Sequence, residues 1–88
     1  MSLLPEEIIQ TEGKFISLAS PRRSTSGKTM IWDVVNDFGA KIGEIRWFGR
    51  WRCYSFYPLD GTIFEHQCLM DLSRLCQNAT TAKRKRRA

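Results

Sequence analysis

Aromatic and basic side chains are interleaved over residues 46–52. The aromatic members of the candidate site are Phe48 and Trp51, and the cations around them are Arg46, Arg50 and Arg52. Aromatic rings beside arginines on an open sheet can stack unpaired nucleic-acid bases, and each stacked base contributes about 1–3 kcal/mol. The alternative is structural: the two rings form a cross-strand pair that stabilises a hairpin, covered by the N-terminal segment or by a second copy of the chain.

The excess positive charge lies at the C-terminal end of the sequence. The formal net charge is +5. Five positive charges stand in one terminal run, which consists of Lys83, Arg84, Lys85, Arg86 and Arg87. The rest of the chain is balanced, with nine basic and nine acidic residues. A second basic segment at residues 20–28 contributes Arg22 and Arg23. Such segments contact phosphates or acidic protein surfaces; the alternative is a solvated, disordered arm with no dedicated partner.

The residue types suited to catalysis do not assemble into a catalytic site. His66 and Cys68 would project about 200° apart on a helix, so they cannot pair. Asp33 and Glu44 are candidates for paired carboxylates, but Arg46 is close enough to favour a solvated salt-bridge cluster. Three cysteines without CxxC spacing predict buried free thiols in a reducing cytosol. We therefore expect a non-enzymatic, cytoplasmic protein with no metal site and no cofactor.

A hairpin is expected to present the aromatic and basic stretch. Residues 41–48 and 51–57 form its strands, and Gly49-Arg50 forms a two-residue type II′ turn. Side chains alternate between the two faces of a sheet, so this register sorts them into two sets. One face, expected to carry the helix, holds Met30, Trp32, Val34, Ile45, Trp47, Tyr54 and Phe56. The other face holds Ile31, Asp33, Val35, Ile42, Glu44, Arg46, Phe48, Trp51, Cys53, Ser55 and Tyr57.

Two further strands and a C-terminal helix complete the expected fold. The strands lie at residues 14–18 and 30–35, and residues 20–28 form a loop. The helix begins with a capping box of Thr62 and Glu65 and ends near Asn78. A helical turn is expected near Pro5, at the N-terminal end.

The residues between Ile31 and Leu72 resemble a group of small bacterial and phage proteins without an assigned function. The resemblance rests on the runs IWDVVN, IGEIRWFGRWRCYSFYP and TIFEHQCLMDL. It is similar to a pattern of IWxV, LGxIxW and WRxYxFxP strands followed by a TVF…CLxD helix start. It implies a domain of strands followed by a helix and implies no chemistry.

The sequence thus predicts an α+β fold, a three- or four-stranded antiparallel meander with a C-terminal helix packed on one face. A single domain would span residues 1–79, and residues 80–88 would be a disordered basic tail. The expected function is weak nucleic-acid binding through the tail, the basic loop and the aromatic end of the sheet. The alternative is a protein-interaction module, a phage accessory protein or a homodimer, that uses the same sheet face. No membrane partner is expected, and the chain would be a monomer or a homodimer.

Overall fold

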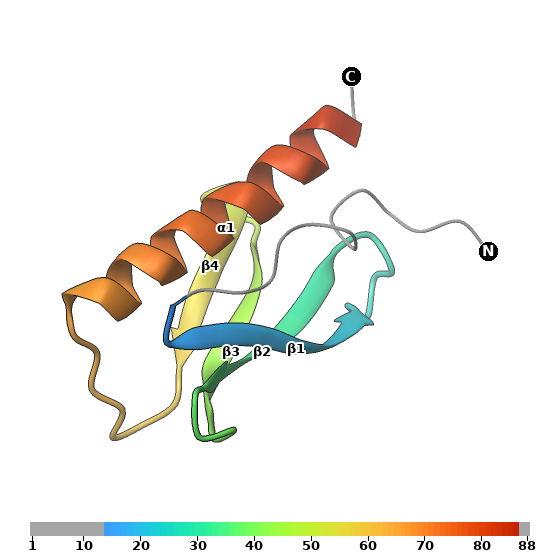
Figure 1. Cartoon of the computed structure of the whole chain (residues 1–88). Helices are drawn as coiled ribbons and strands as arrows, with labels where there is room; N and C mark the ends of the chain where they lie inside the picture. Colours follow the sequence, from blue (N-terminus) through green and yellow to red (C-terminus); the bar gives the residue numbers. More distant parts are fainter. Residues whose placement is uncertain (1–13, 87–88) are drawn as a thin grey trace.

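One antiparallel sheet and one helix laid across it make up the regular structure (Figure 1). The computed structural model describes residues 14–86. Its elements are β1 (Ile16–Arg23), β2 (Met30–Asn36), β3 (Lys41–Phe48), β4 (Cys53–Pro58) and α1 (His66–Arg86). The four strands lie in chain order, and each pairs antiparallel with the next. The predicted α+β class is confirmed, while the helical turn expected near Pro5 lies outside the described residues.

The hydrophobic core lies between the sheet and α1. Its buried side chains are Ile16, Leu18, Met30, Trp32, Val34, Ile45, Tyr54, Leu72, Leu75 and Ala79. Tyr54 makes T-shaped ring contacts with Trp32 and with Trp47, each at a centroid distance of 5.4 Å. Its hydroxyl accepts a hydrogen bond of 3.0 Å from the Met30 N–H, so the buried phenol is satisfied. Trp47 and Phe56 also pack on this core, which confirms the predicted helix-facing set of sheet residues.

The connection between β3 and β4 differs from the predicted turn. Phe48 pairs with Cys53, so residues 49–52 form a four-residue loop. A type II′ turn at Gly49-Arg50 would need positive φ at Gly49, and this glycine does not have it. The pairing partners on β4 therefore shift by two residues. An even shift keeps each side chain on its face, which is why the predicted faces survive the wrong turn.

Two backbone hydrogen bonds close this loop. The Trp51 N–H donates to the Phe48 carbonyl at 3.1 Å, and the Arg52 N–H donates to the Gly49 carbonyl at 3.2 Å. Arg52 has a φ of +52°, in the left-handed region that residues with a Cβ seldom adopt. The last loop residue thus has the conformation that glycine usually supplies in hairpin loops of more than two residues.

An irregularity between β2 and β3 reorients one predicted side chain. Val34 pairs with Gly43 and Val35 pairs with Lys41, so Ile42 is an extra residue on β3. Such a bulge re-aims the side chain that it inserts. Ile42 accordingly packs against the core, which corrects its predicted place on the open face.

A second irregularity lies on β1, which continues where a loop was expected. Ala19 pairs with Asp33 and Arg22 pairs with Ile31, so β1 holds one more residue than β2 over this interval. Ser20, with a φ of +51°, lies within the irregular stretch. The extra residue changes the parity of the strand, and Arg22 therefore shares the open face with Ile31 and Asp33.

Both ends of α1 differ from expectation. At the start, the Glu65 carboxylate accepts a hydrogen bond of 2.7 Å from the Cys68 N–H and caps the helix. The Thr62 hydroxyl donates to the Leu59 carbonyl instead of joining a capping box. The predicted Thr62–Glu65 capping box is therefore wrong, although the helix begins within one residue of Glu65.

The C-terminal end of α1 extends well past Asn78. Ala79 and Thr80 are buried, and the Thr80 hydroxyl accepts a hydrogen bond of 2.9 Å from the Tyr54 N–H on β4. The same hydroxyl donates to the Cys76 carbonyl at 2.9 Å. Because these contacts anchor the helix to the sheet, it continues to Arg86. This corrects the disordered tail predicted from residue 80 onward; residues 87–88, which include Arg87, lie outside the described part.

Candidate nucleic-acid interface

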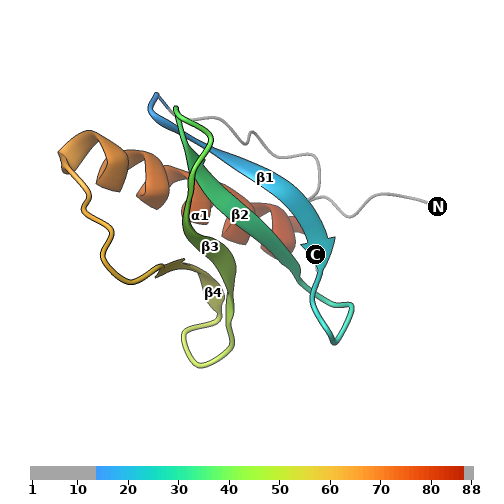
Figure 2. The same cartoon turned by 90° about the horizontal axis from the view of Figure 1, so that it is seen from below.

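Three segments that are far apart in the sequence meet at one end of the sheet. Because the strands alternate in direction, the β1–β2 loop and the β3–β4 loop lie at the same end (Figure 2). The C-terminal part of α1 reaches both of them. The Lys83 ammonium donates to the Lys28 carbonyl at 3.0 Å, and the Arg84 guanidinium donates to the Arg52 carbonyl at 3.4 Å. Two helix residues thereby hold the two loops beside the helix end.

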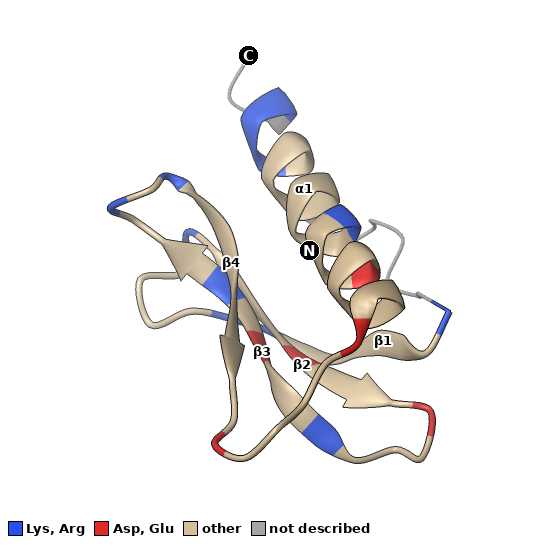
Figure 3. Ribbon diagram, turned by 90° about the vertical axis from the view of Figure 1, so that its left-hand side faces the viewer, with Lys and Arg blue, Asp and Glu red and all other residues tan. Residues whose placement is uncertain are grey.

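This end of the molecule is strongly basic, and we call it the basic end. It consists of Arg23, Lys28, Arg50, Trp51, Arg52, Lys83, Arg84 and Lys85. Figure 3 shows that the cations at the C-terminal end of α1 and those of the β3–β4 loop lie toward the same end of the molecule. The sequence has no acidic residue between Glu44 and Asp60, or after Asp71. The positive charges of the basic end are therefore not offset by an adjacent carboxylate from these segments.

Trp51 stands at the tip of the β3–β4 loop. Its side chain is 66% exposed, whereas Phe48 beneath it is half-buried. The two rings meet in a T-shaped arrangement at 4.7 Å with an interplanar angle of 77°. The predicted Phe48–Trp51 pair does form. Trp51 lies in the loop and Phe48 is the last residue of β3, so the two residues are not directly opposite each other on paired strands. It leaves most of the Trp51 indole in contact with solvent.

The predicted cations of the β3–β4 loop and of α1 differ in how exposed they are. Arg50, Arg52, Arg84 and Lys85 are exposed. Lys83 is half-buried, and its ammonium lies 5.2 Å from the centre of the Trp47 ring, a cation–π contact that fixes the side chain over the sheet. Arg86 is the last residue of α1. Cations at a helix C-terminus also interact favourably with the helix dipole, so part of their role is structural.

Arg23 and Lys28 belong to the β1–β2 side of the basic end. Arg23 ends β1, and its guanidinium donates to the Gly27 carbonyl at 3.4 Å across the loop. Lys28 was not among the site residues predicted from the sequence. The absence of acidic residues in segment 20–28 was a signal for it, but only the hydrogen bond from Lys83 to the Lys28 carbonyl shows that this loop meets the helix end.

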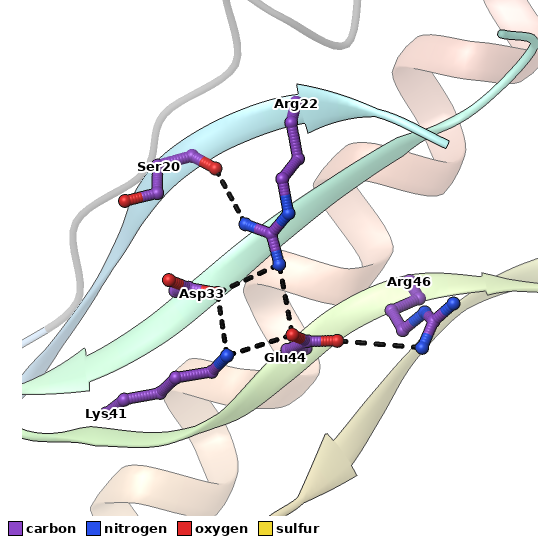
Figure 4. A network of polar contacts seen from close by, with 6 residues as sticks. All are labelled: Ser20, Arg22, Asp33, Lys41, Glu44 and Arg46. Atoms are coloured by element: carbon purple, nitrogen blue, oxygen red, sulfur yellow. Dashed lines mark hydrogen bonds and ion pairs between the residues drawn. The ribbon is translucent and has the colours of Figure 1, made fainter. Parts of the chain in front are cut away.

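Arg22 and Arg46 lie elsewhere, in a charge network on the face opposite α1 (Figure 4). The Arg22 guanidinium lies 3.1 Å from Asp33 and 3.0 Å from Glu44. Lys41 lies 3.1 Å and 2.9 Å from the same two carboxylates, and Arg46 lies 3.6 Å from Glu44. The predicted salt-bridge cluster is therefore confirmed, with Arg22 and Lys41 as additional partners. Both predicted arginines are directed at carboxylates and do not join the basic end.

The two carboxylates of this network are held in their ionised form. Burial alone would raise the pKa of Asp33, but hydrogen bonds from Lys41 and Arg22 outweigh it and hold the pKa below the usual value. The hydrogen bond from Lys41 is the main cause that lowers the pKa of Glu44. At neutral pH neither group carries the proton that a general acid must donate.

Two of the three thiols, Cys68 and Cys76, are poorly suited to nucleophilic chemistry. Burial raises the pKa of the Cys76 thiol to about 11 and also raises that of Cys68. Reactive cysteines have lowered pKa values, so both thiols are poor nucleophiles. His66 is an exposed residue at the first position of α1, 3.4 Å from the Glu65 carboxylate.

The described residues also bear on metal sites and on membrane spans. Within residues 14–86, His, Cys, Asp and Glu side chains form no group of three or more that could hold a metal ion. The single described helix is not long and apolar enough to cross a bilayer.

Comparisons with known proteins give no further guide to the site. No protein-family model, no curated protein and no solved structure matches the chain. The resemblance of the Ile31–Leu72 stretch to small bacterial and phage proteins stays a prediction.

Proposed function

We propose that the protein is a small, non-enzymatic binding module that contacts nucleic acid through the basic end. The observation that carries the proposal is the convergence of the β1–β2 loop, the β3–β4 loop and the C-terminal end of α1. Cations from three segments can face one phosphate chain, and neutralising phosphates releases bound counterions. The affinity is expected to be modest, because only a few of these cations can contact phosphates at once.

Binding through phosphate contacts should depend measurably on salt concentration. With about three or four phosphate contacts, the logarithm of the binding constant should fall against the logarithm of salt concentration with a slope of roughly −2 to −4. Phosphate contacts carry little sequence information, so sequences of equal length and strandedness should bind similarly. Fluorescence anisotropy with labelled oligonucleotides over a salt series measures both properties.

A matched pair of lysine variants tests the location of the site. Lys85→Gln removes an exposed cation of the basic end, and Lys14→Gln removes an exposed cation that lies outside it. Lys85→Gln should weaken binding and reduce the magnitude of the salt slope by about 0.7–0.9. Lys14→Gln should leave both unchanged. Equal losses for the two variants, or no binding by the full chain at low salt, would contradict the proposal.

A second candidate function, a protein-interaction module, is favoured by the sheet face opposite α1. This face carries the half-buried Ile31 and Val35, the exposed Tyr57 and the charge network, and no described element lies over it. Non-obligate interfaces are about as apolar as the rest of a protein surface, so a face that mixes apolar and charged side chains is compatible with a weak protein interface. Sedimentation of the full chain over a concentration series tests self-association, and Tyr57→Ser should weaken any dimer that uses this face.

A further inference from the structure

We infer, on the basis of the proposed function, that the nucleic acid is single-stranded and that Trp51 stacks on an unpaired base. Base stacking on an aromatic side chain requires a base that has left its own stack. Trp51 is 66% exposed at the loop tip, and the contact with Phe48 supports the indole from one side. The supported ring is the one large aromatic surface within the basic end.

Exposure alone does not single out Trp51, because Phe38 is 90% exposed in the β2–β3 loop. The surroundings distinguish the two rings. Phe38 follows the acidic residue Asp37, whereas Trp51 lies between Arg50 and Arg52. A ring flanked by cations can receive a base while its neighbours contact the adjoining phosphates.

The backbone at Arg52 points to a role for its side chain. Its φ of +52° is strained for a residue with a Cβ, and glycine at this position would remove the strain. Residues kept in such conformations often serve a functional site. The chain here retains a long cation next to the exposed indole, at a position where a residue without a side chain suits the fold better.

The contact between α1 and this loop places a further cation, Arg84, beside the loop that carries Trp51. The Arg84 guanidinium reaches the Arg52 carbonyl at 3.4 Å, so the helix end adjoins the loop that carries Trp51. A strand whose base stacks on Trp51 would have its phosphates next to the helix end. A duplex could meet the same cations, but its paired bases would not reach the indole.

The test compares single-stranded and duplex DNA with the full 88-residue chain. The probes are a labelled short oligothymidine and a labelled duplex of the same length, in low salt. The variants are Trp51→Ala, Trp51→Phe and, as the matched control, Phe38→Ala. Intrinsic fluorescence provides a second readout: Trp32 is buried and Trp47 is half-buried, so a stacked base should quench mainly Trp51.

The full chain should bind the single strand more tightly than the duplex. Trp51→Ala should weaken single-strand binding about 5- to 150-fold, the range given by one stacked base. Its duplex binding should change less than about twofold. Trp51→Phe should keep most of the single-strand affinity, and Phe38→Ala should behave as the parent chain. Thermal unfolding of each variant shows whether the fold is intact.

Each other outcome has a defined meaning. Equal binding of the single strand and the duplex, or equal losses for both in Trp51→Ala, would overturn the single-strand inference and leave the proposed function standing. Tighter binding of the duplex would indicate that the β3–β4 hairpin enters a groove, and would also overturn the inference. Failure of the full chain to bind either probe would refute the proposed function and this inference together.

Discussion

Replacing Arg52 by glycine is expected to stabilise the fold. Arg52 has a φ of +52°, and a left-handed backbone costs a residue with a Cβ about 1–2 kcal/mol. Glycine removes this strain, but it also gives the unfolded chain more freedom, which lowers stability by about 0.4–1 kcal/mol. The free energy of unfolding of Arg52→Gly should therefore rise by about 0.8 kcal/mol at the middle of the two ranges, and by at most about 1.6 kcal/mol.

Arg50→Gly is the matched control for this substitution. Arg50 lies in the same loop, is exposed, and has no positive φ. The control loses the same side chain and the same charge, so it should show only the unfolded-state effect and lose about 0.4–1 kcal/mol. The difference between the two variants then isolates the backbone strain at Arg52, about 1–2 kcal/mol.

Urea unfolding followed by circular dichroism measures both variants. The midpoints should move in opposite directions with the m-value unchanged, because the surface exposed on unfolding stays the same. In thermal unfolding, 1 kcal/mol corresponds to about 4–8 °C for a domain of this size. If Arg52→Gly is no more stable than Arg50→Gly, the conformation is not strained, and the argument that Arg52 is retained for its side chain fails.

Three further substitutions test contacts that hold the fold together. Gly43→Ala should cost about 1–3 kcal/mol, because its new Cβ would lie 2.5 Å from a backbone carbonyl. Gly49→Ala is the control in urea unfolding, because its new Cβ would meet only the Trp47 side chain, at an ordinary contact distance of 4.0 Å. Thr80→Val should cost about 1–3 kcal/mol by leaving the buried Tyr54 N–H without its acceptor, whereas the exposed Thr81→Val should change stability by less than about 0.5 kcal/mol. Burial alone would raise the pKa of Asp71, but backbone and side-chain hydrogen bonds hold this pKa below the usual value. The stabilisation by the Asp71 carboxylate is therefore present above the unfolded-state pKa and is lost as pH falls through the folded-state pKa. Asp71→Asn should flatten this part of an acid-unfolding curve.

Apart from Ile42, which a bulge moves, the faces of the β3 and β4 side chains could be predicted, because between bulges they depend only on parity. A two-residue turn and a four-residue loop after Phe48 give the same alternation, so the error in the turn did not move Trp47 or Tyr54. The loop length itself could not be predicted. It depends on a left-handed arginine at Arg52, where turn rules favour glycine.

The bulges and the true end of α1 show where local rules give way to tertiary contacts. Arg22 was expected in a loop, but it lies on the open face because β1 continues through it with one extra residue, and its carboxylate partners lie on other strands. The helix end had a readable signal, since Ala79 continues the apolar spacing of Leu72 and Leu75. Asn78 suggested a C-cap, but the burial of Ala79 and the hydrogen bonds of Thr80 outweigh that local preference.

The hydrogen bond between Thr80 and Tyr54 has a consequence for aggregation. An uncovered edge strand offers a row of free backbone groups to any other extended chain. On β4, the outward Tyr54 N–H is already occupied by the Thr80 hydroxyl. On β1, the other edge, the irregular pairing contains Pro21, which has no N–H to donate. Each edge strand therefore has one position where no free N–H is available to a further strand. Strand addition at either edge of the sheet, and fibril growth through it, should be disfavoured.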